Sequence, residues 1–108
     1  MRLRDLEPSF IKREREGFLR VDSIKDADGL WFLCPACYVA NKGSKGTHAL
    51  LCWSVKVGQD VTPRPGRWQL VGTCIDDLTL VAAQSSIRLT DSPCKAHFYI
   101  RNGVIVHA

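Results

Sequence analysis

The chain has 108 residues, of which 45% are hydrophobic and 24% charged, and its formal net charge is +4 at pH 7. This length fits one domain, residues 1–108, with a modest core, and excludes a second domain of ordinary size. The composition is ordinary for a soluble globular protein, and a net charge this mild does not by itself indicate a nucleic-acid-binding protein.

The N-terminal segment, residues 1–16, predicts a short helix with mixed charge. Its helical pattern runs from about Pro8 to Glu16, and Gly17 ends it. Six of the fifteen Lys and Arg residues lie within the first 20 positions, but four carboxylates are interleaved with them. Such mixing is typical of a solvated helix face, whereas a nucleic-acid-binding surface gathers charges of one sign.

Short runs of aliphatic, aromatic and β-branched residues predict six to eight strands in the rest of the chain. They cover residues 18–21, 30–33, 48–57, 68–71, 78–81 and 87–89. The clearest signal is C-terminal, where 98–101 and 104–107 flank Asn102-Gly103, the pair typical of a type I′ hairpin turn. The predicted fold class is therefore mainly β (α+β at most), a small antiparallel β-sheet domain with a short N-terminal helix and a C-terminal β-hairpin.

The cellular location follows from what the sequence lacks. Its longest apolar run, Ala49–Trp53, is far too short to span a bilayer, and the N-terminus has no apolar segment of the signal-peptide kind. We therefore expect a cytoplasmic protein without a membrane partner. In that reducing compartment, five cysteines favour a metal site over disulfides, and an odd number would leave one thiol over.

Two ligand pairs with the same spacing, C-P-A-C at 34–37 and C-K-A-H at 94–97, predict a metal site. Structural Zn²⁺ is bound by four Cys and His side chains in a closed tetrahedron. We predict that Zn²⁺ staples the core over residues 29–106 and that its ligands are Cys34, Cys37, Cys94 and His97. Such a site supplies about 10–16 kcal/mol in small peptides, which is comparable with the whole stability of a small domain, about 5–15 kcal/mol.

Other assignments of these residues stay open. His48 and Cys52 face the same side of a predicted strand, so either could replace one of the four ligands or support one. The cysteines could also be buried without metal, or Cys34 and Cys37 could be a redox pair. The redox interpretation is weaker because we expect no helix N-terminus at Cys34 to lower its pKa. Cys74 has no partner at ligand spacing and is predicted to be a buried apolar residue.

The carboxylates of Asp76 and Asp77 have two interpretations. Asp in a turn usually accepts hydrogen bonds from its own backbone, and this is the better account. The alternative is an enzyme, a metal-dependent hydrolase or nuclease that uses His48 with Asp76 or Asp77 at an incompletely saturated zinc.

The loop from Gly58 to Gly66 contains two prolines and predicts no regular structure. Arg64 and Arg67, with Trp68 after them, are candidates for contact with a partner, because Trp and Arg are frequent anchors of interfaces. The alternative for Trp68 is a place in the core, where the tryptophans of small β domains usually lie.

Several motifs together resemble a family of small uncharacterised proteins from bacteriophages, prophages and bacteria. The resemblance covers residues 29–106 and rests on C-P-A-C at 34–37, Trp68, T-L at 79–80, S-I at 86–87, C-K-A-H-F at 94–98 and the glycine at 103. The chain departs from the family pattern at 81–86, which is longer and lacks a proline. The resemblance implies metal binding and a phage or prophage origin, and it implies no activity.

The sequence thus predicts a structural-zinc binding module that contacts a macromolecule of the host or of the phage, more readily a protein than a nucleic acid. One form of this function would be inhibition of a host defence or replication protein. The alternatives are the metal-dependent enzyme and a sequence-tolerant nucleic-acid-binding protein, whose affinity would fall steeply with salt.

Overall fold

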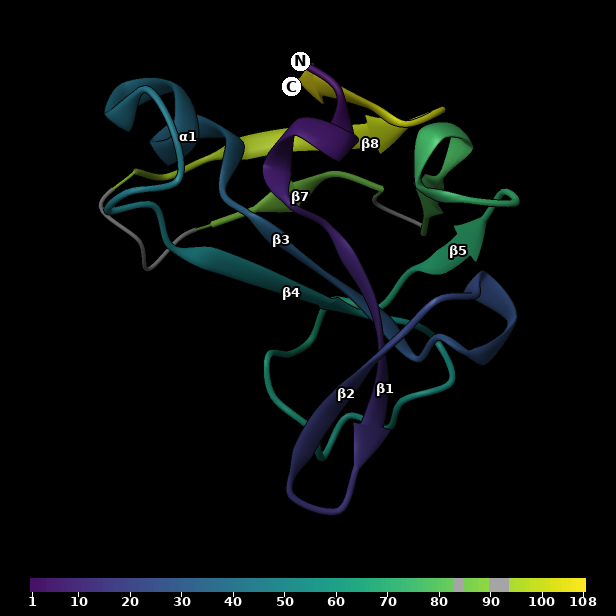
Figure 1. Cartoon of the computed structure of the whole chain (residues 1–108). Helices are drawn as coiled ribbons and strands as arrows, with labels where there is room; N and C mark the ends of the chain where they lie inside the picture. Colours follow the sequence, from purple (N-terminus) through teal and green to yellow (C-terminus); the bar gives the residue numbers. More distant parts are fainter. Residues whose placement is uncertain (83–84, 90–93) are drawn as a thin grey trace.

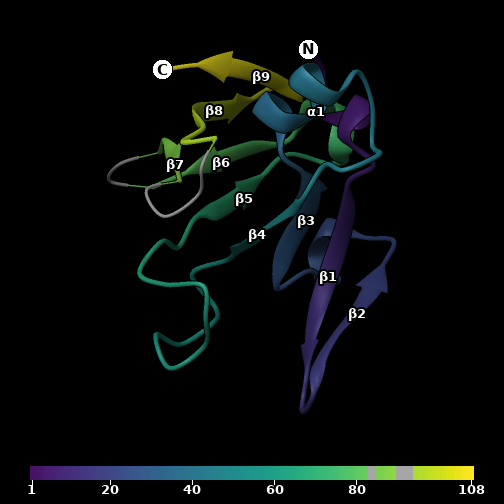
Figure 2. The same cartoon turned by 90° about the vertical axis from the view of Figure 1, so that its left-hand side faces the viewer.

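In the computed structural model, which describes residues 1–82, 85–89 and 94–108, nine strands pair into three antiparallel sheets (Figures 1 and 2). The largest sheet has the order β2 (Gly17–Val21), β1 (Ser9–Glu14), β3 (Gly29–Leu33), β4 (Ala49–Trp53). The second sheet pairs β5 (Gln69–Val71) with β6 (Thr79–Val81), and the third has the order β7 (Ile87–Arg88), β8 (His97–Arg101), β9 (Val104–His107). The predicted mainly β class is confirmed.

Helical structure is sparse in the described residues. It consists of one α-helix, α1 (Pro35–Asn41), and three short 3-10 turns, η1 (Leu3–Leu6), η2 (Ile24–Asp26) and η3 (Ile75–Asp77). None of these described helices is long and apolar enough to cross a membrane.

The helix predicted within residues 1–16 is wrong, because Ser9–Glu14 is strand β1. β1 pairs with β2 on one side and with β3 on the other, and these two ladders outweigh the local helical pattern. Gly17, expected to end a helix, lies with a φ of +108° at the turn of the β1–β2 hairpin. Leu3 and Leu6, fully buried in η1, are the anchors of the N-terminus.

The core lies between the large sheet and the C-terminal sheet. Phe32 of β3 and Phe98 of β8 are almost fully buried, and their rings meet edge to face with centroids 6.0 Å apart at 88°. Leu30 and Cys52 add to this core from β3 and β4, and Ile100 adds to it from β8. Alternate residues of the strands thus pack into one apolar centre, as the period-2 pattern predicts.

The predicted C-terminal hairpin is confirmed. β8 and β9 pair with Arg101 opposite Val104, and the turn residues Asn102 and Gly103 have φ values of 48° and 71°. Gly103 has a second role, because an added Cβ there would collide with the backbone of Asp76. The hairpin turn is therefore packed closely against η3.

Candidate metal centre

Cys34 and Cys37 are positioned by the start of α1. Cys34 is the residue before the helix, and Pro35 occupies its first turn, where a proline is well tolerated. The backbone N–H groups of Cys37 and Ala36, in the first turn of this helix, act to lower the pKa of the Cys34 thiol. The turn between the paired cysteines therefore points amide groups at a thiolate, which stabilises the form that binds metal.

His48 reaches the same place through the register of the large sheet. It directly precedes β4, and its carbonyl oxygen accepts a hydrogen bond of 2.9 Å from the backbone amide of Cys34. His48 and Cys34 are thus opposite each other in the continued β3–β4 ladder. The fourth member, Cys94, comes from the segment that leads into β8.

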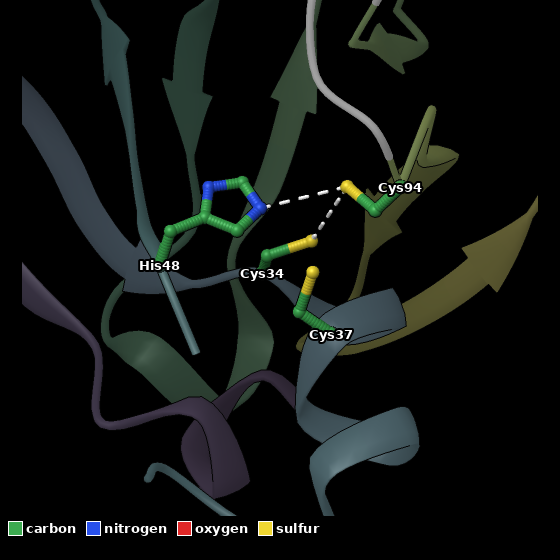
Figure 3. A group of neighbouring side chains, drawn as sticks. All are labelled: Cys34, Cys37, His48 and Cys94. Atoms are coloured by element: carbon green, nitrogen blue, oxygen red, sulfur yellow. Dashed lines mark hydrogen bonds between the residues drawn. The ribbon is translucent and has the colours of Figure 1, made fainter. Parts of the chain in front are cut away.

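Figure 3 shows the four side chains pointing toward one another. Their ligand atoms all lie within 4.8 Å of each other. The Cys94 sulfur is 3.8 Å from the Cys34 sulfur and 3.5 Å from Nε2 of His48. Ideal Zn–S and Zn–N bonds give a tetrahedron with edges of about 3.8 Å for S···S and about 3.5 Å for S···N. The two distances from Cys94 therefore match the edges of such a tetrahedron, and the ligand types are those of a Cys₃His metal centre.

The histidine of this centre is His48, the alternative ligand, rather than His97. His97 lies outside the group, as the first residue of β8, where it pairs with Arg88 and is exposed while the next residue, Phe98, enters the core. A C-x-x-H pair can share a metal when a turn joins the two residues. Here the strand begins at the histidine and its pleat fixes the direction of the side chain.

Cys52, the other alternative ligand, also lies outside the group. It is four residues after His48 along an extended strand, a distance of about 13 Å, so the two cannot share one ion. Cys52 is 2% exposed within the core, and this burial raises the pKa of its thiol to about 12. It is a core residue.

The clustered thiols hold their protons tightly without a cation. Burial raises the pKa of Cys37 to about 12, with further increases from the neighbouring Cys94 and Cys34 thiols. The pKa of Cys34 is also raised, first by burial and also by Cys94, although the backbone N–H groups of Cys37 and Ala36 oppose the change. Three negative sulfurs at these distances need a cation between them.

The redox interpretation of Cys34 and Cys37 is weakened by the same observation. A helix does begin directly after Cys34, contrary to our expectation from the sequence. A redox-active C-x-x-C pair, however, has a cysteine whose pKa is lowered, and the pKa of both thiols is raised here.

Asp76 and Asp77 lie away from the metal centre. Figure 1 shows η3, in green, on the side of the molecule opposite α1. Asp77 accepts hydrogen bonds of 2.8 Å from the amides of Thr73 and Cys74 and one of 2.6 Å from the Thr73 hydroxyl. These bonds, the Thr73 hydroxyl first, lower the pKa of Asp77 to about 2. The predicted turn role is confirmed for Asp77, and Cys74, predicted to be buried, is exposed.

The loop before β5 is built around Arg67. All five N–H groups of its guanidinium donate to backbone carbonyl oxygens at 2.6–2.9 Å, those of Val57, Gly58, Val61, Pro63 and Gly66. Arg67 therefore has no N–H donor left for a partner. Trp68 is half-buried against the core, and its indole N–H donates to the Ser85 carbonyl (3.2 Å). Arg64 is exposed, with one long bond of 3.3 Å to Gln59.

Arg67 was predicted as a partner contact, and its structural role could not be predicted from the sequence, because no motif shows which carbonyl oxygens a loop turns inward.

A scan against protein-family models finds no match for the chain, and searches among curated proteins and among solved structures likewise find none. The case for the metal centre therefore rests on the geometry of its four side chains.

Proposed function

We propose that the chain is a binding module whose fold is stapled by a structural Zn²⁺ ion, with Cys34, Cys37, His48 and Cys94 as its ligands. The single observation that carries this proposal is the convergence of these four ligand atoms within 4.8 Å of one another, with the two distances from the Cys94 sulfur equal to edges of a zinc tetrahedron. Three thiolates and one imidazole are also a donor set that favours Zn²⁺ over the hard cations Mg²⁺ and Ca²⁺.

The role of the ion is structural because four protein ligands close the tetrahedron. A catalytic zinc keeps one position for water or substrate, and this donor set leaves none. The ion would also join three distant parts of the chain, the start of α1, the start of β4 and the segment before β8. A reducing cytoplasm would keep its thiols available for the metal.

The partner in this proposal is a protein of the host or of a phage. The resemblance to small phage and prophage proteins supports that origin, and it leaves inhibition of a host defence or replication protein as one specific form of the function. A hydrolase or nuclease is less well supported, since Asp77 is engaged in its own turn and lies outside the cluster.

The test is the metal content of the purified chain. Elemental analysis should find one zinc per chain, and cobalt substitution should give the absorption bands of tetrahedral thiolate coordination. Cys37→Ser should abolish both results, while Cys74→Ser, which changes an exposed cysteine outside the cluster, should leave both unchanged. A wild-type chain that binds neither metal would overturn the proposal.

A further inference from the structure

A groove of about 890 Å³ runs between β4 and β7, and the loop that contains Arg67 closes one end of it. Its β4 side is formed by Ala49 to Cys52 and its β7 side by Ser86 to Leu89. Each of these strands is the last of its sheet, so among the described residues each has one outer edge without a paired strand, and only the last residue of β4, Trp53, is bonded there, by the Trp68 amide (3.2 Å). Edges of this kind are templates for a further strand.

The atoms along the β4 edge can be assigned from the hydrogen bonds. The carbonyl of His48 accepts from Cys34 of the opposite strand, so His48 faces β3. Alternate residues of an antiparallel strand face its partner, so Ala49 and Leu51 direct their N–H and C=O groups toward the open edge. In the described part of the chain neither residue has a hydrogen-bond partner at that edge. The N–H and C=O groups of Ala49 and Leu51 are therefore four backbone groups along the groove that can pair with an added strand.

The β7 wall has the same property. The amide of Leu89 donates to the carbonyl of Ala96 (2.8 Å), so Leu89 faces β8. Arg88, one residue earlier, directs its backbone N–H and C=O away from β8, and no hydrogen bond to them is found among the described residues. The groove is therefore bordered on both sides by backbone groups that have no hydrogen-bond partner among residues 1–82, 85–89 and 94–108.

The charge of the groove is of one sign. Its charged lining residues are Arg64, Arg67 and Arg88, and no carboxylate lines it among the described residues. Arg64 and Arg88 are exposed and lack an acidic partner in the described chain. The other lining side chains are largely apolar, among them Leu51, Trp68, Ile87 and Leu89. A ligand that fits this surface combines carboxylates with apolar groups.

We propose that the groove binds an extended segment of a partner protein, which pairs with β4 as an added strand and carries Asp or Glu alternating with apolar residues. Main-chain hydrogen bonds to Ala49 and Leu51 supply affinity, and alternate side chains reach Arg64, Arg88 and the apolar lining. The inference deepens the proposed function and rests on it, because it gives the binding module its surface and the class of its partner.

The metal centre adjoins both walls of this groove. His48 directly precedes Ala49 of the β4 wall, and Cys94 lies two residues before Ala96, whose carbonyl accepts from Leu89 of the β7 wall. An ion bound to both residues fixes the spacing of the walls. Removal of the metal should therefore weaken the binding of the peptide.

A nucleic acid fits the groove less well. A single strand would need an aromatic face for stacking, and the six-membered ring of Trp68 is packed so closely on Gly66 that an added Cβ would lie 2.6 Å from it. Its indole N–H is also engaged with the Ser85 carbonyl. The row of unpaired N–H and C=O groups, in contrast, matches a peptide backbone.

The test is selection of peptides from a phage-displayed library of random dodecapeptides on the immobilised zinc-loaded chain, followed by NMR with the enriched peptides. We expect enriched sequences with acidic residues alternating with apolar ones, and chemical-shift changes at the amides of Ala49, Leu51 and Arg88. Arg88→Glu should lower the affinity at least tenfold. Arg15→Glu, the same change in the turn of the β1–β2 hairpin, should leave it unchanged.

The proposal is overturned if no peptide is enriched, if the enriched peptides are basic, or if they shift amides outside the groove. Displacement of the peptide by a single-stranded oligonucleotide at moderate salt would also overturn it, in favour of nucleic-acid binding. Elemental analysis of the same sample separates the two proposals. A chain that holds one zinc but enriches nothing rejects the groove alone, and a chain that enriches these peptides without metal rejects the zinc alone.

Discussion

Side chains hold two parts of the molecule, the metal centre and the Arg67 loop, in opposite ways. At the metal centre, four side chains from three separate parts of the chain converge on one point. In the Arg67 loop, residues 57–67, a single guanidinium donates to five carbonyl oxygens that lie within ten positions of it. Both arrangements hold a part of the chain outside the strands, the segment before β8 in the first case and residues 57–67 in the second.

The difference between them is what each needs in order to form. The Arg67 loop is complete by itself, since each donor has an acceptor and the charge of the guanidinium faces five carbonyl dipoles. The metal centre spans up to 60 positions, from Cys34 to Cys94, and its thiols raise each other's pKa. The Arg67 loop needs only its own residues, whereas the metal centre is long-range and in our proposal needs a bound ion.

Removal of the metal is the largest perturbation that this comparison predicts. A chelator should unfold the chain or leave it without cooperative melting, because the ion supplies about 10–16 kcal/mol and the domain has about 5–15 kcal/mol to lose. Thermal melting followed by circular dichroism, with and without chelator, measures the effect. Cys34→Ser should behave like the chelated chain and Cys74→Ser like the wild type. An unchanged Tm after complete removal of the metal would contradict the long-range role.

The choice between the two histidines gives the next largest effect. His48→Ala should lower zinc affinity by more than a hundredfold, since the loss of a ligand exceeds the 10–100-fold typical of an outer partner of the ligand. His97→Ala should leave the affinity unchanged, because this side chain lies outside the cluster. Competition with a chromogenic chelator measures both affinities. The reverse pattern would restore the C-x-x-H assignment.

The two histidines also show which ligands of the site could be predicted from the sequence. Ligand spacing along the chain identified Cys34, Cys37 and Cys94, whereas the histidine depends on a register. Cys34 and His48 meet because β3 and β4 pair with these residues opposite each other, and spacing rules carry no information on strand register.

In the fold, too, features set by local sequence could be predicted and features set by strand pairing could not. The Asn102-Gly103 hairpin was predictable because two turn residues with positive φ decide it locally. Ser9–Glu14 was not, because this segment becomes a strand only by pairing with β2 and β3, and β3 is distant in sequence. Composition likewise predicted an irregular loop before Trp68. It could not predict that the carbonyl oxygens of this loop accept hydrogen bonds from Arg67, because they face the guanidinium only once the loop has closed.

The Arg67 loop should respond to mutation more weakly than the metal centre. Arg67→Ala should lower the free energy of unfolding by about 2 kcal/mol, the scale of hydrogen bonds that involve a charged group, because exposed carbonyls regain water. Arg67→Lys should fail to restore it, since an ammonium cannot reach five acceptors in a planar fork. Urea denaturation measures both variants. Arg64→Ala is the matched control and should stay within about 0.5 kcal/mol of the wild type. Loss of zinc from Arg67→Ala would show that the two regions are not independent.

Asp77 stabilises only its own turn, so its replacement should change stability least among these variants. Asp77→Asn keeps the oxygen that accepts from the Thr73 and Cys74 amides, but its Nδ2 cannot accept from the Thr73 hydroxyl, so Tm should fall by less than in Arg67→Ala. The folded pKa is lowered to about 2, so the stabilisation by the carboxylate is complete above the unfolded value of about 4 and is lost only as pH falls toward 2. The Tm difference from the wild type should therefore be constant between pH 6 and pH 8. Zinc content should be unchanged, and its loss would instead place Asp77 in the metal site, as the enzyme alternative requires.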